Sequence, residues 1–287
     1  MNNVLGILSK RKPGLFNKVI QIFCNKKCVW NDEIKPSNLD KHNLVLLCDM
    51  LIKSPTHNII RHRRQKKLDY YHVDHAYFWR GYSHVTGNKN PFKCEWFRIS
   101  KNSHALNQIL DVDDSRWKKY FYDYFGGYGK EYSKRGSKIL FCPPSSHVFS
   151  LYDQKDWTED TLQQLRKNTD REIVIRSKPN DNSKDNISLS TNLTLEEDLE
   201  DCWAIVTHSS CAAITAHLMG VPSFSDLNSP TAPVSLSDYS KIENPFYPDD
   251  IHKMNWLNSL AYSQYTISEF KSDTYSWIFN SIRKSIE

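Results

Sequence analysis

Short apolar runs alternate with helix-like segments throughout the second half of the chain. The runs are four or five residues long, and several are rich in β-branched side chains, as in strands buried on both faces of a parallel sheet. The segments between them carry apolar residues at helical spacing. The pattern predicts a Rossmann-like sheet between about residues 136 and 226. Its predicted strands are residues 138–142, 172–176, 187–190 and 203–206, and its predicted helices are residues 158–167 and 195–199.

The last of these strands leads into the most specific local pattern. It ends at the polar residues Thr207 and His208, and Ser209 or Ser210 follows as the N-cap of a helix. Small and apolar residues form one face of that helix, and Gly220 occupies the position where a helix C′ residue is expected. We therefore predict strand, tight turn, helix and strand in this order.

The first half of the chain shows the same kind of alternation less regularly. Ser54 and Pro55 are placed as the start of a helix between two apolar runs. Strand, helix and strand in succession predict a second α/β domain. Its predicted strands are residues 18–24, 43–48, 68–73 and 92–100, and residues 116–125 are predicted to form a helix.

Glycines at positions 126, 127 and 129 separate the two patterns and predict a flexible linker. We expect one domain at residues 1–135 and another at residues 136–287. The predicted fold class is α/β, with two Rossmann-like domains and a cleft between them. Closing helices are predicted at residues 252–262 and 273–286, and the second of these is expected to pack back on the first domain.

Composition points to a protein of the cytoplasm. No apolar run approaches the roughly 18 residues that span a bilayer, and residues 1–12 lack the apolar core of a signal peptide. The seven cysteines are scattered, which is typical of a reducing compartment. Cys24 and Cys28 have no second pair at zinc-site spacing, so no metal is expected.

Charge divides at the predicted domain boundary. Residues 1–135 contain 25 Lys and Arg against 12 Asp and Glu, a net charge of +13, whereas the remainder contains 13 against 21, a net charge of −8. A field of one sign attracts polyanions such as nucleic acid or an acidic glycan. The first domain is therefore expected to face such a partner, with a solvated basic surface as the alternative.

Loops at the carboxyl ends of the predicted parallel strands meet at one edge of a sheet. Hydroxyl groups and cations in these loops suit a diphosphate, with Ser209 and Ser210 at a helix start. The alternative is that the serines only cap the helix. Glu243, in a loop-rich stretch, is a candidate for ribose hydroxyls or a solvated acid. The full set of candidate donor-binding residues is Ser145, Ser146, Arg176, Lys178, His208, Ser209, Ser210 and Glu243.

Asp74 and His75 end a predicted strand of the first domain, where a carboxylate or imidazole can take a proton from an acceptor hydroxyl. Basic and aromatic residues near them suit stacked bases or sugars. Core packing explains the aromatic residues equally well. The candidate acceptor-binding residues are Arg61, Arg63, Arg64, Tyr77, Trp79, Arg80 and Arg98.

In the second half of the chain a strand ends in Arg-Ser-Lys-Pro, and a later strand is followed by Thr-His-Ser-Ser and by a helix that ends in Leu-Met-Gly-Val-Pro-Ser. This order of elements resembles the donor domain of GT-B glycosyltransferases. The resemblance covers roughly residues 136–224 and is nearest to the capsule-polysaccharide and Kdo transferase group and to small phage-encoded, DNA-modifying glycosyltransferases. The family often has His-Pro where this chain has Lys178-Pro179. No Walker-type lysine motif or GxGxxG is present, which argues against ATP hydrolysis and a dinucleotide oxidoreductase.

The resemblance implies a metal-independent glycosyltransferase without a cofactor, whose co-substrate is a nucleotide sugar, expected to be UDP-linked. With the charge division, it suggests as acceptor a hydroxymethylated base in phage DNA, flipped out of the duplex. Localisation would then be the host cytoplasm. Two alternatives stay open: transfer to an acidic surface polysaccharide, and a non-catalytic nucleic-acid-binding module.

Overall fold

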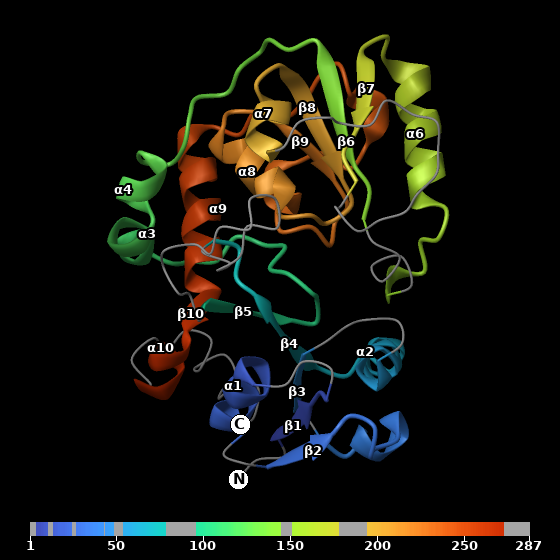
Figure 1. The fold of residues 1–287 in the computed structure, drawn as a ribbon, viewed down its shortest axis with the longest axis vertical. Coiled ribbons are helices and arrows are strands. Elements are labelled where there is room, and N and C mark those ends of the chain that lie inside the picture. Colours follow the sequence, from blue (N-terminus) through green and yellow to red (C-terminus); the bar gives the residue numbers. More distant parts are fainter. Residues whose placement is uncertain are drawn as a thin grey trace.

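The computed structural model describes residues 4–10, 14–24, 27–42, 44–48, 54–78, 96–144, 151–177 and 194–272. Two sheets, each flanked by helices, lie one above the other in Figure 1. Several predictions lie outside the described residues: the strand at 187–190, the helix at 273–286, and the site residues Trp79, Arg80, Ser145, Ser146 and Lys178.

The first sheet has six strands in the order β10-β5-β4-β3-β1-β2. Strands β2, β1, β3 and β4 are parallel, while β5 runs antiparallel to both β4 and β10. The strand predicted at 43–48 is confirmed over Leu44–Cys48, and every residue of β3 is buried, as its continuous apolar run requires. The strands are β1 Val4–Leu8, β2 Cys28–Trp30, β3 Leu44–Cys48, β4 Tyr70–His75, β5 Trp96–Lys101 and β10 Gln264–Thr266.

Helices cover both faces of this sheet. Helix α1 (Leu15–Phe23) buries Phe16, Val19 and Ile20 against one face, with α10 (Ile267–Ser272) beside it. The prediction of a strand at 18–24 was wrong, because these apolar positions have the i, i+3, i+4 spacing of a helix. Helix α2 (Pro55–Gln65) and the short helix η1 (Pro36–Leu39) cover the other face. Ser54 caps α2 as predicted, accepting a hydrogen bond from the Thr56 amide.

The second sheet confirms the predicted parallel pattern. Its four strands, in the order β7-β6-β8-β9, are all parallel. Side chains of β6 alternate, so that Ile139 and Phe141 pack toward α6 while Leu140 and Cys142 pack toward α7 and α8. The elements are β6 Lys138–Cys142, α6 Trp157–Asn168, β7 Glu172–Ile175, α7 Leu195–Leu199, β8 Cys202–Thr207, α8 Ala212–Leu218 and β9 Ser223–Ser225.

The end of the described chain returns to the first sheet. After η2 (Ala232–Val234) and η3 (Tyr239–Lys241), α9 (Asp250–Tyr262) runs beside both units and leads into β10 (Figure 1). Trp256 lies in one core cluster with Trp117 of α3 (Ser115–Tyr120) and Ile214 of α8, so this core joins both units. None of the described helices is long and apolar enough to cross a membrane.

The glycine-rich segment between the units is hydrogen-bonded to the second unit. It follows α4 (Tyr122–Phe125), and its backbone bonds to α8, where the Lys130 amide donates to the Leu218 carbonyl at 2.8 Å. A Cβ added to Gly129 would lie 2.6 Å from that carbonyl oxygen. The glycine at this position therefore permits close backbone approach, which is a second use of glycine besides flexibility.

Candidate active site

Parallel pairing places the ends of β6, β7 and β8 side by side. Phe141 pairs with Ile175, and Cys142 pairs with Thr207. The segments that follow, which include Arg176 and the turn 208–211, therefore start at the same edge of the sheet. This is the edge at which the sequence predicts a donor site.

Arg176 is already paired at this edge. Its guanidinium forms an ion pair with the Asp198 carboxylate on α7, and the Asp198 side chain is only 1% exposed. A buried carboxylate needs a cation of this kind. The positive charge that the sequence assigns to a diphosphate is thus balanced within the protein.

His208 is fully buried and holds a hydrogen-bonded position. Its Nε2 bonds the Gln154 side-chain oxygen, and Gln154 Nε2 donates to Asp226 at 3.0 Å. Because that amide oxygen only accepts, Nε2 carries the proton, so in the neutral ring Nδ1 accepts from the Ser209 hydroxyl at 3.1 Å. Burial lowers the pKa of His208 while Asp226 opposes the shift, so the neutral ring is favoured.

Ser210 forms local hydrogen bonds just before α8. Its hydroxyl accepts from the Ala212 amide at 3.2 Å, and its carbonyl accepts from the Ala213 amide at 3.3 Å. Helix α8 begins at Ala212 and has only seven residues. The N-cap residue of α8 is Cys211, without a side-chain capping hydrogen bond, so the prediction of Ser209 or Ser210 as the N-cap was wrong. Binding of a donor phosphate by Ser210 stays a prediction.

Asp74, at the end of β4, approaches this turn through Arg98 of β5. Arg98 donates from one guanidinium nitrogen to Asp74 at 2.9 Å and from the other to the Cys211 sulfur at 3.4 Å. The residue pairing of β4 and β5 sets Asp74 opposite Arg98. A candidate base of the first unit and the Ser209–Cys211 turn of the second therefore belong to one contact network.

The His75 side chain packs elsewhere, although its backbone amide donates to the Asp74 carboxylate at 2.8 Å. Neighbouring residues of a strand point to opposite faces, and the His75 ring packs edge-on against Phe16 of α1, 4.9 Å between centroids. Asp74 and His75 therefore face different surroundings. Asp74 is the one of the pair that contacts Arg98.

Arg63 of the predicted acceptor surface is buried. It is 0% exposed and donates to the backbone carbonyls of Asp69, Leu39 and His42 at 2.8 to 3.1 Å. The prediction that it contacts an acceptor is therefore wrong in this structure, because its donors hold the chain around η1 and β4. Burial is the main cause of its lowered pKa.

Arg61 and Arg64 both contact residues of the second unit. Arg61 pairs with Asp153 at 3.1 Å, while Arg64 donates to the Leu151 carbonyl at 3.1 Å and lies over the Tyr152 ring. These residues of α2 therefore hold the segment 151–154, whose Gln154 bonds His208.

Tyr77 belongs to the protein core, which agrees with core packing as the alternative explanation of the aromatic residues. It is 5% exposed, and its hydroxyl accepts from the Leu106 amide at 2.6 Å. The ring also lies 5.0 Å from the Arg98 guanidinium carbon. Tyr77 therefore supports Arg98 and has no open face for a flipped base.

Glu243 lies at the wrong end of the sheet for its predicted role. It pairs with Arg171 at 3.0 Å, and Arg171 immediately precedes β7. The ribose of a donor bound at the carboxyl ends of the strands would be at the opposite edge. The surroundings of Glu243 thus contradict its predicted binding of ribose hydroxyls. That prediction was based only on the loop-rich sequence around it.

Sequence reasoning missed four polar residues here, His104, Tyr152, Gln154 and Asp226. His104 is buried and its Nδ1 lies 2.6 Å from the Tyr152 hydroxyl. Burial, with the charge of Arg98 next in effect, lowers the pKa of His104 well below its usual value. Asp226 directly follows β9, so the rule of strand ends would have found it. His104 lies in the loop beyond the predicted strand at 92–100, whereas Tyr152 and Gln154 do not directly follow a predicted strand.

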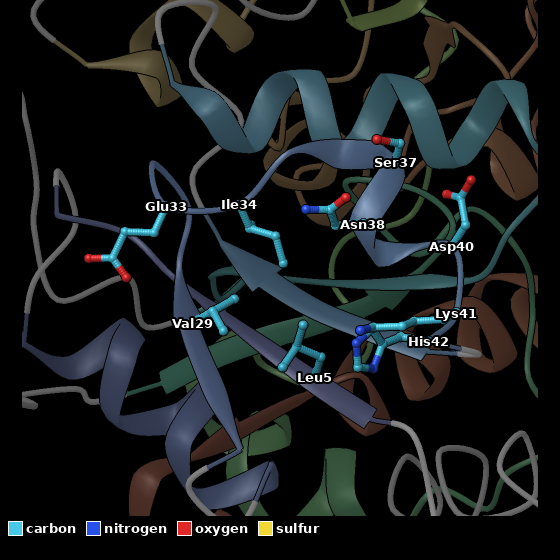
Figure 2. Close-up of a pocket in the computed structure, with 9 residues that line it drawn as sticks. All are labelled: Leu5, Val29, Glu33, Ile34, Ser37, Asn38, Asp40, Lys41 and His42. Atoms are coloured by element: carbon cyan, nitrogen blue, oxygen red, sulfur yellow. The ribbon is translucent and has the colours of Figure 1, made fainter.

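A separate depression lies at the far side of the first sheet. It has a volume of about 740 Å³ and an open shape. In Figure 2 Glu33 lies at one end and Lys41 and His42 at the other. Leu5 and His42 place it near the starts of β1 and β3, away from Asp74. It is therefore not part of the candidate active site.

Comparison with known proteins identifies the fold. No protein-family model and no curated protein matches the chain. Two solved structures match over its full length, the KpsC beta Kdo 2,4 transferase and the KpsC beta Kdo 2,7 transferase of Thermosulfurimonas dismutans. The first has a TM-score of 0.52 at 12% identity and covers 100% of this chain and 99% of the other. The second has a TM-score of 0.52 at 8% identity, covering 99% and 98%. The chain thus has two Rossmann-like domains in a GT-B-like arrangement.

Proposed function

We propose that this protein is a glycosyltransferase that moves a sugar from a nucleotide sugar to an acceptor hydroxyl. The observation that carries the proposal is the contact network from Asp74 through Arg98 to the Ser209–Cys211 turn. It sets a carboxylate of one Rossmann-like domain beside a strand-end turn of the other. Transfer between two substrates requires such a two-sided site.

In the proposed reaction, the nucleotide sugar binds at the carboxyl ends of β6, β7 and β8. Asp74 takes the proton from the acceptor hydroxyl as this oxygen forms a bond to the sugar, and the bond from the sugar to the diphosphate breaks. Asp74 is well placed for this role because its side chain is 22% exposed, so it remains accessible. Polar groups on the donor side stabilise the charge of the leaving diphosphate.

The acceptor in this proposal is a hydroxymethylated base in DNA, with an acidic polysaccharide as the second candidate. The charge of +13 on residues 1–135 supports a polyanion in either case. The contacts of Arg61, Arg63 and Arg64 leave less of α2 for DNA than the sequence suggests. The fold shared with two Kdo transferases supports sugar transfer in either case.

Mass spectrometry of the acceptors tests the proposal and chooses between them. The protein is incubated with UDP-linked and CMP-linked sugars and with hydroxymethylated DNA, plain DNA or an acidic polysaccharide. A mass gain of one sugar on hydroxymethylated DNA alone supports the DNA acceptor, and a gain on the polysaccharide alone supports the alternative. Duplex binding without binding of any nucleotide sugar would instead indicate a nucleic-acid-binding module.

A further inference from the structure

Arg98 has more hydrogen-bond donors than its protein partners use. It is 6% exposed, and its contacts are one Asp74 oxygen and the Cys211 sulfur, a weak acceptor. Its Nε is buried and has no hydrogen-bond partner within the described part of the chain. A guanidinium carries five N–H donors, so this group is incompletely satisfied.

Arg116 shows what a saturated buried arginine looks like in the same protein. It donates to both carboxylate oxygens of Glu269 and to the backbone carbonyls of Ala261 and Gln264, at 2.6 to 2.9 Å. A buried donor without an acceptor costs about 1–3 kcal/mol. The difference between the two arginines therefore indicates that Arg98 has unused donor capacity for an additional acceptor.

Arg98 is therefore a better candidate than Arg176 for the donor cation, which differs from the sequence prediction. Arg176 is matched by the buried Asp198 carboxylate. Arg98, predicted to contact the acceptor, extends from the first domain to Cys211, next to the predicted phosphate turn. The neighbouring His104 adds no charge, because its pKa is well below the usual value.

We propose that Arg98 binds a phosphate group of the donor against the Ser209–Cys211 turn, which completes the donor site from the opposite domain. This inference rests on the proposed function. Phosphate oxygens replace the Cys211 sulfur as acceptors, and they suit the fork of a guanidinium far better. The proposal depends on the buried Arg98 and not on the short helix α8.

This assignment makes donor binding a property of both domains together. The phosphate would contact Arg98 on β5 and the turn after β8, so only the assembled two-domain protein holds it. Asp74 is bonded to the same guanidinium, so the proposed base and the leaving group share one cation. A carboxylate also competes with phosphate for this cation, and its removal should therefore strengthen phosphate binding.

Calorimetric titration of the full chain with inorganic pyrophosphate and with UDP tests the proposal. Asp74→Asn is expected to bind pyrophosphate severalfold more tightly than wild type. The double variant Arg98→Met with Asp74→Asn removes the ion pair as a whole, and is expected to bind about tenfold more weakly than Asp74→Asn alone. Glu269→Gln alters another buried arginine–carboxylate pair, away from the cleft, and is expected to leave the affinity within about twofold.

Each outcome of this experiment decides the matter. Equal pyrophosphate affinity in Asp74→Asn and the double variant, with native circular dichroism in both, overturns the role of Arg98. If UDP then still binds, the proposed function stands without this inference. If pyrophosphate binds through Arg98 but neither UDP nor any nucleotide sugar binds, the phosphate site stands and the proposed donor fails. Absence of binding of all ligands to wild type refutes both.

Discussion

Replacing Arg116 by methionine should destabilise the protein strongly. The Arg116 side chain is 1% exposed and that of Glu269 is 8% exposed, and together they hold α3 to the end of α9, β10 and α10. Breaking a buried pair by removing one partner costs about 3–5 kcal/mol, because the remaining charge is left buried. We therefore expect a loss of this size in the free energy of unfolding.

The size of the effect should also depend on pH. Burial tends to raise the pKa of Glu269, but the hydrogen bonds and charge of Arg116 hold it below its usual value of 4.5. The native carboxylate thus contributes stability above that value, and the contribution is lost as pH falls through the lower folded pKa. In Arg116→Met the carboxyl pKa is raised instead, so the variant's deficit relative to wild type should shrink below about pH 5.

Urea unfolding followed by tryptophan fluorescence measures this effect. The double variant Arg116→Met with Glu269→Gln should be more stable than Arg116→Met alone at pH 7. With Glu269→Gln completing the double-mutant cycle, the interaction energy between the two residues should be about 1–3 kcal/mol. Lys118→Met breaks an exposed pair with Asp114 and should cost much less stability than Arg116→Met. A cost below about 1 kcal/mol for Arg116→Met, or strict additivity in the double variant, would refute the reasoning.

Three further predictions concern stability and are measured by chemical unfolding. Gly220→Ala meets a backbone oxygen at 2.1 Å at a φ of +81°, while Gly14→Ala, also at +81°, meets nothing within 4 Å. Both substitutions should cost about 1–3 kcal/mol of backbone strain. Gly220→Ala should cost at least about 1 kcal/mol more than Gly14→Ala because of its steric overlap, and equal costs would contradict this explanation. Arg63→Met should cost about 3 kcal/mol or more, since three backbone carbonyls lose their donor. Arg61→Met breaks a partly exposed ion pair and should cost under about 1 kcal/mol. The reverse order of the two costs would refute the argument from burial. Burial lowers the pKa of Lys253 to about 8 from 10.5. Between about pH 8 and 10.5 the unfolded chain therefore binds more protons than the folded protein. As pH increases through this range, the stability of wild type relative to Lys253→Met should rise by up to about 3 kcal/mol. A pH-independent difference would contradict the shift.

The second sheet was predictable because its strands β6, β8 and β9 are buried on both faces. Continuous apolar runs such as 138–142 and 203–206 mark such strands without knowledge of the tertiary contacts. Gly220 likewise signalled the end of α8, where its φ is +81°. Local rules suffice where one short segment contains its own signal.

Helix α1 and strand β5 show where local rules fail. A window starting at Lys18 omits Phe16 and so hides the helical spacing that Val19 and Ile20 complete. The antiparallel direction of β5 depends on its pairing with β4 and β10, which no single segment encodes. The helical state of α1 and the direction of β5 both depend on residues or contacts outside the stretch under inspection.

Charged side chains of the site were the hardest to assign from sequence. The positions of Arg63, Arg98 and Arg176 are correct within their elements, but their roles depend on which acceptors lie opposite them. A carboxylate or a backbone carbonyl brought from a distant segment converts a candidate binding residue into a structural one. Only the tertiary structure supplies those partners.

Release of free nucleotide tests the central claim most directly. Wild type is incubated with each nucleotide sugar and a mixture of the candidate acceptors, and the nucleotide is quantified by chromatography, with Asp74→Asn and Glu243→Gln in parallel. The account predicts acceptor-dependent release by wild type, about a hundredfold or greater loss in Asp74→Asn, and near-normal release in Glu243→Gln. Equal release by wild type and Asp74→Asn, or no release from any nucleotide sugar, would contradict it.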